Sequence, residues 1–234
     1  MSVDKSAPRV RRMFAEISGR YDRLNHLLSL SLDRYWRWQA TRRAPAEGAL
    51  PILDLCTGTG DLALSYRRHV SKEIPVIGAD FCHEMLVCGT HKVVANQPIL
   101  WVEADAEALP FPDDSFQLVS VAFGLRNIAD TDRGLSEMAR VCAPGGQVVV
   151  LEFSSPTWQP FAMFYGAYFR HVLPRIGQLL ARNRQSAYNY LPASVGEFPQ
   201  GEALAERMRL AGLVDIRYHP MTFGVATLYL ARRK

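Results

Sequence analysis

The sequence predicts a single α/β domain built around a mostly parallel β-sheet. An apolar strand that begins at Ile52 and ends in Asp54 leads into a turn that contains Gly58 and Gly60 and opens a helix. This arrangement is typical of the carboxyl edge of a parallel sheet. Further apolar segments follow, separated by helical stretches as in βαβ units. With 234 residues and 48% hydrophobic content, the chain can bury one such core and carry a modest extra lobe.

The N-terminal arm, residues 8–44, is predicted as two helices joined around residues 29–33. Its apolar side chains recur at helical spacing, at Phe14, Ile17, Tyr21, Leu24, Leu27 and Leu28. We expect the arm to fold over the ligand pocket and residues 44–48 to be a linker into the sheet.

The core of the domain is expected at residues 50–152. Strands are predicted at 75–80, 99–103, 117–122 and 147–152, the last introduced by a Pro-Gly-Gly turn at 144–146.

The C-terminal third is predicted as a lobe at residues 153–200 and an ending at 201–234. The ending comprises a helix at 201–211 and a hairpin of strands at 213–219 and 223–231. We expect the hairpin to insert an antiparallel strand, which makes a seven-stranded sheet.

The glycine turn by itself fits two kinds of nucleotide site. Gly58, Gly60 and Ala63, with Asp80 about twenty residues on, match the dinucleotide fingerprint of a dehydrogenase. Asp54 in the first strand argues against it, because a carboxylate is unfavourable beside a pyrophosphate. S-adenosylmethionine carries a sulfonium and an ammonium and no phosphate, so the sequence favours that cofactor.

The following elements supply the rest of such a pocket. Asp80 ends the second strand, where its carboxylate can accept both ribose hydroxyls. Phe81 is expected against the adenine. Asp105 can accept the adenine amino group, and the Ala106 backbone N–H can donate to a ring nitrogen.

These motifs resemble the ubiquinone/menaquinone biosynthesis C-methyltransferases nearly end to end. The resemblance implies a class I S-adenosylmethionine-dependent methyltransferase fold, with a Rossmann-like seven-stranded sheet, an N-terminal helical arm and a helical insertion. It places cofactor contacts at Thr59, Asp80, Asp105, Ala106 and Ala122. Cys56 and Ala122 depart from the usual residues of the family, and neither change removes a charge. The matching segments are residues 14–22 with Asn25, 53–61, 123–130, 144–146, 151–154, 190–194, 198–199 and 223–226.

The reaction that the resemblance implies is methylation of a ring carbon of a prenylated quinol. It requires a cation to hold the developing phenolate, and Arg126, just past the fourth strand, is the first candidate. The alternative is a surface arginine paired with Asp130 or Asp132. Asn127 is expected to bind a substrate oxygen, or else to be a loop residue, and Tyr21 is expected at the pocket, or else in helix packing. No histidine has a recognisable catalytic context, so the general base stays unassigned.

The acceptor is expected to be 2-phytyl-1,4-naphthoquinol, because the stretch at residues 168–177 looks most like the cyanobacterial and plastid branch of the family. Demethylmenaquinol and the benzoquinol of ubiquinone synthesis are the alternatives.

Composition indicates a reduced, cytoplasmic protein in contact with a membrane surface. The four cysteines lack metal-site spacing, so we expect neither a metal nor disulfides. Residues 1–45 are rich in Lys and Arg, and residues 153–196 contain no acidic residue. An apolar segment edged with cations suits an anionic lipid surface, of the thylakoid or plasma membrane, although ordinary lobe packing explains it as well. The segment comprises Trp158, Phe161, Met163, Phe164, Tyr165, Tyr168, Phe169, Arg170, Arg175, Arg182 and Arg184. A homodimer is compatible with the sequence.

Two other classes of function stay open at this stage. A basic isoelectric point near 9.0 suits a nucleic-acid methyltransferase, but the basic segment has no RNA-binding pattern. A cofactor-binding assembly protein without turnover is the other. A salt-sensitive gel shift would indicate the first, and cofactor binding without methyl transfer the second.

Overall fold

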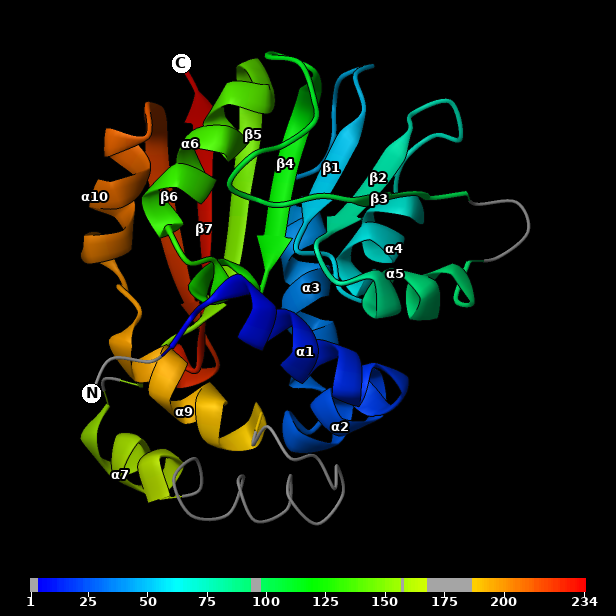
Figure 1. The fold of residues 1–234 in the computed structure, drawn as a ribbon. Helices are drawn as coiled ribbons and strands as arrows, with labels where there is room; N and C mark the ends of the chain where they lie inside the picture. Colours follow the sequence, from blue (N-terminus) through cyan, green and yellow to red (C-terminus); the bar gives the residue numbers. More distant parts are fainter. Residues whose placement is uncertain (1–3, 94–97, 157, 168–186) are drawn as a thin grey trace.

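The computed structural model describes residues 4–93, 98–156, 158–167 and 187–234. Its centre is a seven-stranded sheet in the order β3-β2-β1-β4-β5-β7-β6 (Figure 1). β7 runs antiparallel to both of its neighbours, whereas the other strand pairs are parallel. The predicted mixed sheet is therefore confirmed. The strands are β1 (Ile52–Leu55), β2 (Val76–Asp80), β3 (Leu100–Glu103), β4 (Phe116–Ala122), β5 (Cys142–Phe153), β6 (Leu213–Met221) and β7 (Ala226–Arg233).

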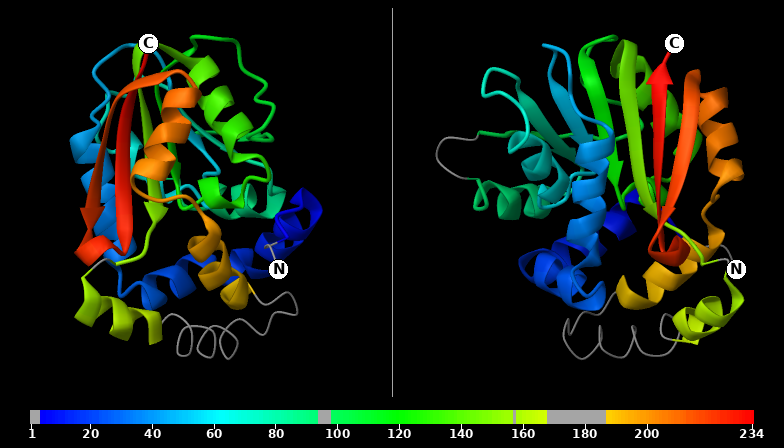
Figure 2. Two further views of the ribbon diagram at one scale, coloured as in Figure 1. Left: turned by 90° about the vertical axis from the view of Figure 1, so that its left-hand side faces the viewer. Right: turned by 180° about the vertical axis from the view of Figure 1, so that it is seen from behind.

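Helices cover both faces of the sheet (Figure 2). α6 (Thr131–Val141) and α10 (Glu202–Leu210) pack on one face, and α3 (Leu32–Arg43) and α4 (Asp61–Arg67) pack on the other. Strands β1, β2 and β4 are buried on both sides, as a central parallel sheet requires. The helical side chains in these contacts include Leu135, Met138, Leu204 and Met208 on the first face and Trp36, Ala40, Leu62 and Tyr66 on the second.

The arm contains three helices and a short turn instead of the two helices that the sequence predicts. α1 (Ala7–Ile17) ends at a 3₁₀ turn, η1 (Ser18–Arg20), and α2 (Tyr21–Leu28) follows it. Gly19 lies in this turn and has a low helix propensity, which explains the break. Ser31 then adopts a φ of +60° ahead of α3. α1 and α2 lie across the carboxyl ends of the parallel strands (Figure 1).

Part of the predicted lobe packs against the arm. α7 (Gln159–Ala167) and α9 (Ala187–Glu197) lie at the same end of the molecule as α1 and α2 (Figure 1). Buried side chains from both parts form a third apolar cluster. Tyr168, Phe169, Arg170, Arg175, Arg182 and Arg184 lie outside the described residues. The third cluster comprises Met13, Ile17, Leu24, Tyr190 and Val195.

The Pro-Gly-Gly segment lies inside β5 instead of before it. The register between β4 and β5 shifts at this point. A Cβ atom on Gly146 would lie 2.9 Å from the Gln117 backbone oxygen, so a glycine is needed where the two strands approach closely. The remaining short elements are α5 (His83–Thr90), η2 (Leu125–Asn127) and η4 (Thr222–Gly224). Within the described ranges, no helix has the length and apolar character needed to cross a bilayer.

Candidate active site

The glycine loop, residues 56–60, joins β1 to α4 at the carboxyl edge of the sheet. Gly58 and Gly60 have φ angles of +57° and +81°, in the left-handed region that glycine adopts without strain. A Cβ atom on Gly60 would lie 2.3 Å from the Trp101 ring, so packing excludes a side chain there. Gly58 instead lines a cavity beside the loop. The two glycines therefore have different roles, one at the cavity and one in packing.

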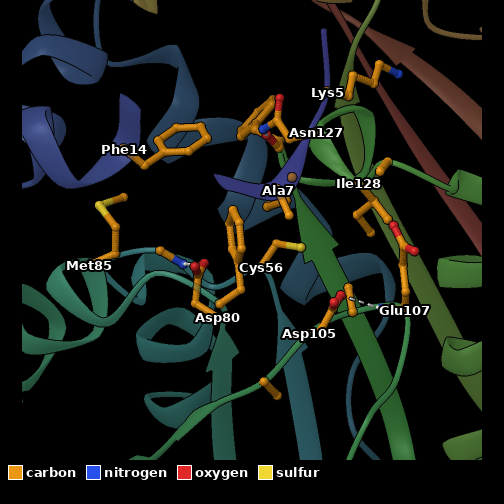
Figure 3. Close-up of a pocket in the computed structure, with 18 of the residues that line it drawn as sticks. Lys5, Ala7, Phe14, Cys56, Asp80, Met85, Asp105, Glu107, Asn127 and Ile128 are labelled. Atoms are coloured by element: carbon orange, nitrogen blue, oxygen red, sulfur yellow. Dashed lines mark hydrogen bonds between the residues drawn. The ribbon is translucent and has the colours of Figure 1, made fainter. Parts of the chain in front are cut away.

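This cavity, which we call the loop cavity, has a volume of about 170 Å³. In Figure 3, Asp80 and Asp105 approach it from the sheet, and Phe14 of the arm faces them across it. Most of the residues predicted for the cofactor therefore meet in one place. Those that line the loop cavity are Tyr21, Gly58, Asp80, Phe81, Asp105, Ala106, Ala122 and Asn127.

Asp80 is the most strongly constrained carboxylate of the loop cavity. Its Oδ2 accepts the Gly58 N–H at 2.8 Å and its Oδ1 accepts the Cys82 N–H at 2.9 Å. Burial raises the pKa of Asp80 to about 6, although these two hydrogen bonds oppose the shift. Asp105 Oδ1 accepts the Glu107 N–H at 2.9 Å, which fixes the turn after β3. Each carboxylate is thus held by backbone groups and keeps lone pairs for a ligand.

Asp54, which the sequence predicts as a cofactor contact, does not line the loop cavity, and the contact stays a prediction. Its side chain lies behind the glycine loop and accepts hydrogen bonds from Thr57 Oγ1 at 2.6 Å and Ser120 Oγ at 2.8 Å. Burial raises the pKa of Asp54 to about 6. The carboxylate therefore supports the loop from beneath.

Thr59 likewise does not line the loop cavity. Its hydroxyl donates to Asp22 Oδ1 at 2.5 Å and accepts from Lys92 Nζ at 3.0 Å. The hydroxyl therefore binds the arm, and the cofactor contact that the resemblance implies at Thr59 stays a prediction.

A second cavity, which we call the arm cavity, lies between the arm, the lobe and the end of the sheet. Its volume is about 460 Å³ and its lining is mostly apolar. Phe14, Tyr21 and Phe123 line both cavities and form their boundary. The Phe14 and Tyr21 rings pack edge to face, 6.0 Å apart. A cavity that carries the carboxylates Asp80, Asp105 and Glu107 thus meets a larger and more apolar cavity at three aromatic side chains.

Arg126 lines the arm cavity, and its side chain is 7% exposed. Its Nη1 donates to Glu152 Oε1 at 2.8 Å and to the Phe123 carbonyl. The alternative pairing with Asp130 or Asp132 is wrong, because Asp130 instead caps α6 by accepting backbone N–H groups. Within the described residues, the buried Arg126 Nε has no hydrogen-bond partner.

Asn127 lines the loop cavity and not the arm cavity. Its Nδ2 makes a long contact of 3.5 Å with the Phe123 carbonyl. Its Oδ1 is buried and, among the described residues, has no hydrogen-bond partner. A buried acceptor without a donor is costly, so this oxygen fits a ligand N–H or O–H.

Several residues of the two cavities escaped the sequence prediction. Glu152 lay in a segment that matched the family, but nothing in the sequence linked it to Arg126, 26 residues away. Phe14 was expected only as a packing residue of the arm. Met85 of α5 carries no charge or motif that singles it out. Phe123 opens a segment that matched the family but was given no role of its own, and the folded structure brings both to the loop cavity.

One group of side chains within the described residues has the geometry for a metal ion. The ligand atoms of His26, Asp33 and Asp61 lie within 4.8 Å of one another. Arg37 Nη1 contacts both carboxylates, and Lys92 also pairs with Asp61. Two cations already neutralise the carboxylates, so the group is an ion-pair network as the chain is folded.

Comparison with known proteins assigns the chain to a family. Residues 1–233 match the ubiE/COQ5 methyltransferase family. The chain belongs to that family. A demethylmenaquinone methyltransferase of Thermus thermophilus is 47% identical over 94% of this chain and 100% of its own length. The corresponding protein of Deinococcus radiodurans is 45% identical over 96% of this chain and 92% of its own length. A ubiquinone/menaquinone biosynthesis C-methyltransferase of Geobacter sulfurreducens is 44% identical over 99% of this chain and 91% of its own length.

Solved structures agree with the fold. An S-adenosylmethionine-dependent methyltransferase of Thermotoga maritima, a possible histamine N-methyltransferase, superposes with a TM-score of 0.68 at 18% identity. The match covers 96% of this chain and 100% of that chain. A Haemonchus contortus phosphoethanolamine N-methyltransferase in complex with S-adenosylmethionine gives a TM-score of 0.60 at 17% identity, over 84% of this chain and 52% of that one. The class I methyltransferase fold is confirmed.

This ubiE/COQ5 family member is therefore an S-adenosylmethionine-dependent C-methyltransferase of quinone biosynthesis. The loop cavity fits the cofactor, because it combines a buried carboxylate at Asp80 with the unfilled acceptor Asn127 Oδ1. Hydroxyl and ammonium groups of the cofactor are donors of the kind that these oxygens require. The arm cavity is larger and mostly apolar, as a site for an apolar ligand requires.

Proposed function

We propose that this enzyme methylates a ring carbon of a 2-prenyl-1,4-naphthoquinol. The observation that carries the proposal is the boundary formed by Phe14, Tyr21 and Phe123, where the carboxylate-lined loop cavity meets the apolar arm cavity. A methyl donor in the first cavity and an aromatic ring in the second come into contact only there. Two of the relatives are demethylmenaquinone methyltransferases, which supports a naphthoquinol acceptor.

The acceptor must be the reduced quinol. A quinone ring is electron-poor, whereas a quinol, above all as its phenolate, concentrates electron density on the carbon beside the hydroxyl. When bound, the cofactor supplies an electrophilic methyl group. The chain's contribution is to place the ring, to stabilise negative charge on its oxygen and to exclude water.

Arg126 is the residue that we propose to stabilise the phenolate. It lies four residues past the end of β4, and its Nη1 donates to the Glu152 carboxylate and to the Phe123 carbonyl. Nε has no described partner, so the guanidinium keeps donor capacity. Because guanidinium stays protonated, Arg126 acts as a charge and not as a base.

Tyr21 is proposed as a hydrogen-bond donor at the boundary of the cavities. Burial raises the pKa of its phenol, with Arg126 and Arg37 opposing the shift, so the hydroxyl is protonated at neutral pH. No histidine lies among the described residues that line either cavity. We propose that a water beside Arg126 takes the hydroxyl proton of the quinol, while the guanidinium stabilises the phenolate that is left. After methylation, water also takes the proton from the same ring carbon, which restores the aromatic ring.

The tail of the acceptor is proposed to lie along the arm cavity toward its mouth. The sequence expectation of a phytyl tail and the demethylmenaquinol named for the relatives differ only in this part. An apolar channel discriminates weakly between chains of similar width. We therefore propose 2-phytyl-1,4-naphthoquinol and demethylmenaquinol as alternative acceptors of the same site.

We also propose that the mouth of the arm cavity contacts a membrane from the cytoplasmic side. Leu30 and Phe223 line the cavity and are 81% and 65% exposed. Trp158 packs on Phe223 with ring centroids 6.0 Å apart, and Met163 of α7 is also exposed. A cluster of exposed apolar side chains at the entrance gives a lipid-tailed substrate a route from a bilayer.

The deciding experiment is methyl transfer from isotopically labelled S-adenosylmethionine in detergent, read by mass spectrometry. The acceptors are demethylmenaquinone, 2-phytyl-1,4-naphthoquinone and a demethylated benzoquinone with a matched tail, each with and without a chemical reductant. We expect label on both naphthoquinols, only under reduction, and little on the benzoquinol. Transfer to the benzoquinol alone, or to none of the three by protein that binds the cofactor, would contradict the proposal.

A further inference from the structure

Lys92, just after α5, contacts three oxygen atoms from three parts of the chain. Its Nζ lies 2.8 Å from Asp22 Oδ2 and 3.0 Å from Thr59 Oγ1, and it also bonds Asp61 Oδ1. An ammonium has three N–H donors, so all of them are used. We call these four residues the Lys92 cluster.

The Lys92 cluster joins the arm to the glycine loop. Asp22 is the residue after Tyr21 in α2, Thr59 lies between the two loop glycines, and Asp61 is the first residue of α4. The Thr59 hydroxyl also donates to Asp22 at 2.5 Å. The Asp22 carboxylate is thus held by one oxygen to the loop and by the other to Lys92.

A second cation strengthens this junction from α3. Arg37 Nη1 lies 3.5 Å from Asp61 Oδ2 and also pairs with Asp33. Burial acts to raise the pKa of Asp61, but Arg37 and Lys92 outweigh it and the pKa is lowered. The side chains of Lys92, Asp22 and Asp61 are 25%, 29% and 23% exposed, so solvent screens these pairs only in part.

The junction sets the position of Tyr21. Neither Lys92 nor Asp22 lines either of the two cavities, whereas Tyr21 lines both. Tyr21 also lies close to the loop, since a Cβ atom on Gly58 would be 4.0 Å from its Cε1. An arm released from the loop would move this ring away from the cavity boundary.

We infer that Lys92 is a positioning residue of the active site, which holds the arm on the glycine loop and thereby completes the cofactor pocket from outside it. The inference rests on the family's cofactor and not on the identity of the acceptor. It can therefore be tested by binding alone.

The test is the affinity for S-adenosylhomocysteine, measured by calorimetry on Lys92→Met, Lys92→Arg, Asp22→Asn and the double variant Asp22→Asn with Lys92→Met. We expect Lys92→Met and Asp22→Asn each to weaken binding about tenfold. Both substitutions break the same contact, so their effects should not add. The Kd of the double variant is expected to lie within about threefold of the Kd of either single variant. Lys92→Arg keeps the charge and is expected to retain most of the affinity.

Salt and a matched control separate positioning from stability. In 0.5 M NaCl we expect the wild-type affinity to approach that of Lys92→Met, which itself changes little. Lys72→Met removes an exposed lysine outside the cluster and is expected to leave binding unchanged. Wild-type affinity in Lys92→Met and Asp22→Asn, with only a lower melting temperature, would overturn the inference. Should Lys92→Met fail to fold, the affinity of Asp22→Asn tests the inference instead, because Asp22 is the arm residue that Lys92 contacts.

Discussion

At the scale of single residues, the active site depends on buried charges whose partners differ in kind. Asp80 is held by backbone N–H groups, whereas Arg126 is held by the side chain of Glu152. The first arrangement leaves a carboxylate with unused lone pairs at the loop cavity, and the second fixes a cation at the arm cavity. Each has a consequence that can be measured.

Cofactor binding is expected to weaken as the pH falls through about 6. Burial raises the pKa of Asp80 to about 6, and the ligand hydroxyls bind its ionised form, so protonation competes with the ligand. The affinity is therefore highest above this pH and falls below it. Near pH 6 part of the protein carries a proton on Asp80, and binding releases that proton. Calorimetry of S-adenosylhomocysteine in two buffers measures that release. Asp80→Asn is expected to lower the affinity at neutral pH about tenfold and to reduce the release; a pH profile unchanged in this variant would assign the release to another group.

Glu152→Gln is expected to lower kcat about tenfold or more while changing the Kd of S-adenosylhomocysteine less than threefold. The substitution keeps the shape of the side chain but removes the charge that orients the Arg126 guanidinium. Steady-state kinetics and calorimetry measure the two effects. Glu137→Gln is the matched control, because Glu137 pairs with Arg140 away from both cavities and is expected to affect only stability. An unchanged kcat in Glu152→Gln would show that Arg126 needs no counter-ion for its role.

At the scale of elements, the glycine loop shows how packing and ligand binding share one turn. Gly58 borders the loop cavity, Gly60 faces Trp101 of β3, and Asp54 of β1 supports the loop from beneath. The turn is therefore held on three sides before any ligand binds, which reduces the ordering that binding requires.

Gly60→Ala is expected to destabilise the protein by about 2 to 4 kcal/mol, since it combines a positive φ with a steric clash. The new Cβ would lie 2.3 Å from the Trp101 ring. Urea unfolding measures the loss. Adding Trp101→Leu to Gly60→Ala relieves the clash but not the backbone strain, and is expected to cost less than the sum of the two single changes. Full additivity would mean that the ring is not what excludes the side chain.

At the scale of the whole molecule, the sheet and the helical end supply different parts of the two cavities. The sheet supplies the carboxylates at its carboxyl edge, and the arm with the lobe closes an apolar space over them (Figure 1). Four exposed apolar side chains, Leu30, Trp158, Met163 and Phe223, belong to that same helical end. We expect a lipid-tailed substrate to enter beside them.

Binding to anionic phospholipid vesicles is expected to weaken about tenfold or more in the double variant Trp158→Ser with Met163→Ser. Both side chains are exposed beside the mouth and neither lines the arm cavity. Vesicle sedimentation measures the change. Leu210→Ser is the control, because Leu210 is 81% exposed on α10, away from the mouth. Equal loss of binding in both proteins, or none in either, would contradict the proposed membrane face.

The sequence alone was sufficient to predict the strand pattern, the glycine loop, the cofactor and the acidic residues that line the loop cavity at Asp80 and Asp105. These features are local: apolar runs, left-handed glycines and acidic residues at strand ends are each set by a few neighbouring positions. The family resemblance added the class of acceptor. The break at Gly19 was missed although its cause, the low helix propensity of glycine, is local. The place of the Pro-Gly-Gly segment was missed because the close approach of β4 and β5 at Gly146 decides it.

Only the tertiary structure decided how the active site is assembled. The partners of Arg126, Thr59 and Lys92 lie 26, 37 and 70 residues away along the chain, at Glu152, Asp22 and Asp22 respectively. The positions of Asp54 and Thr59 away from the loop cavity also follow from such contacts. A residue's type shows which partners it can take, but the choice among several partners of equal chemistry depends on which elements pack together. For that reason the sequence determined the chemistry available to this protein, and the packing of the arm on the sheet determined which residues carry it out.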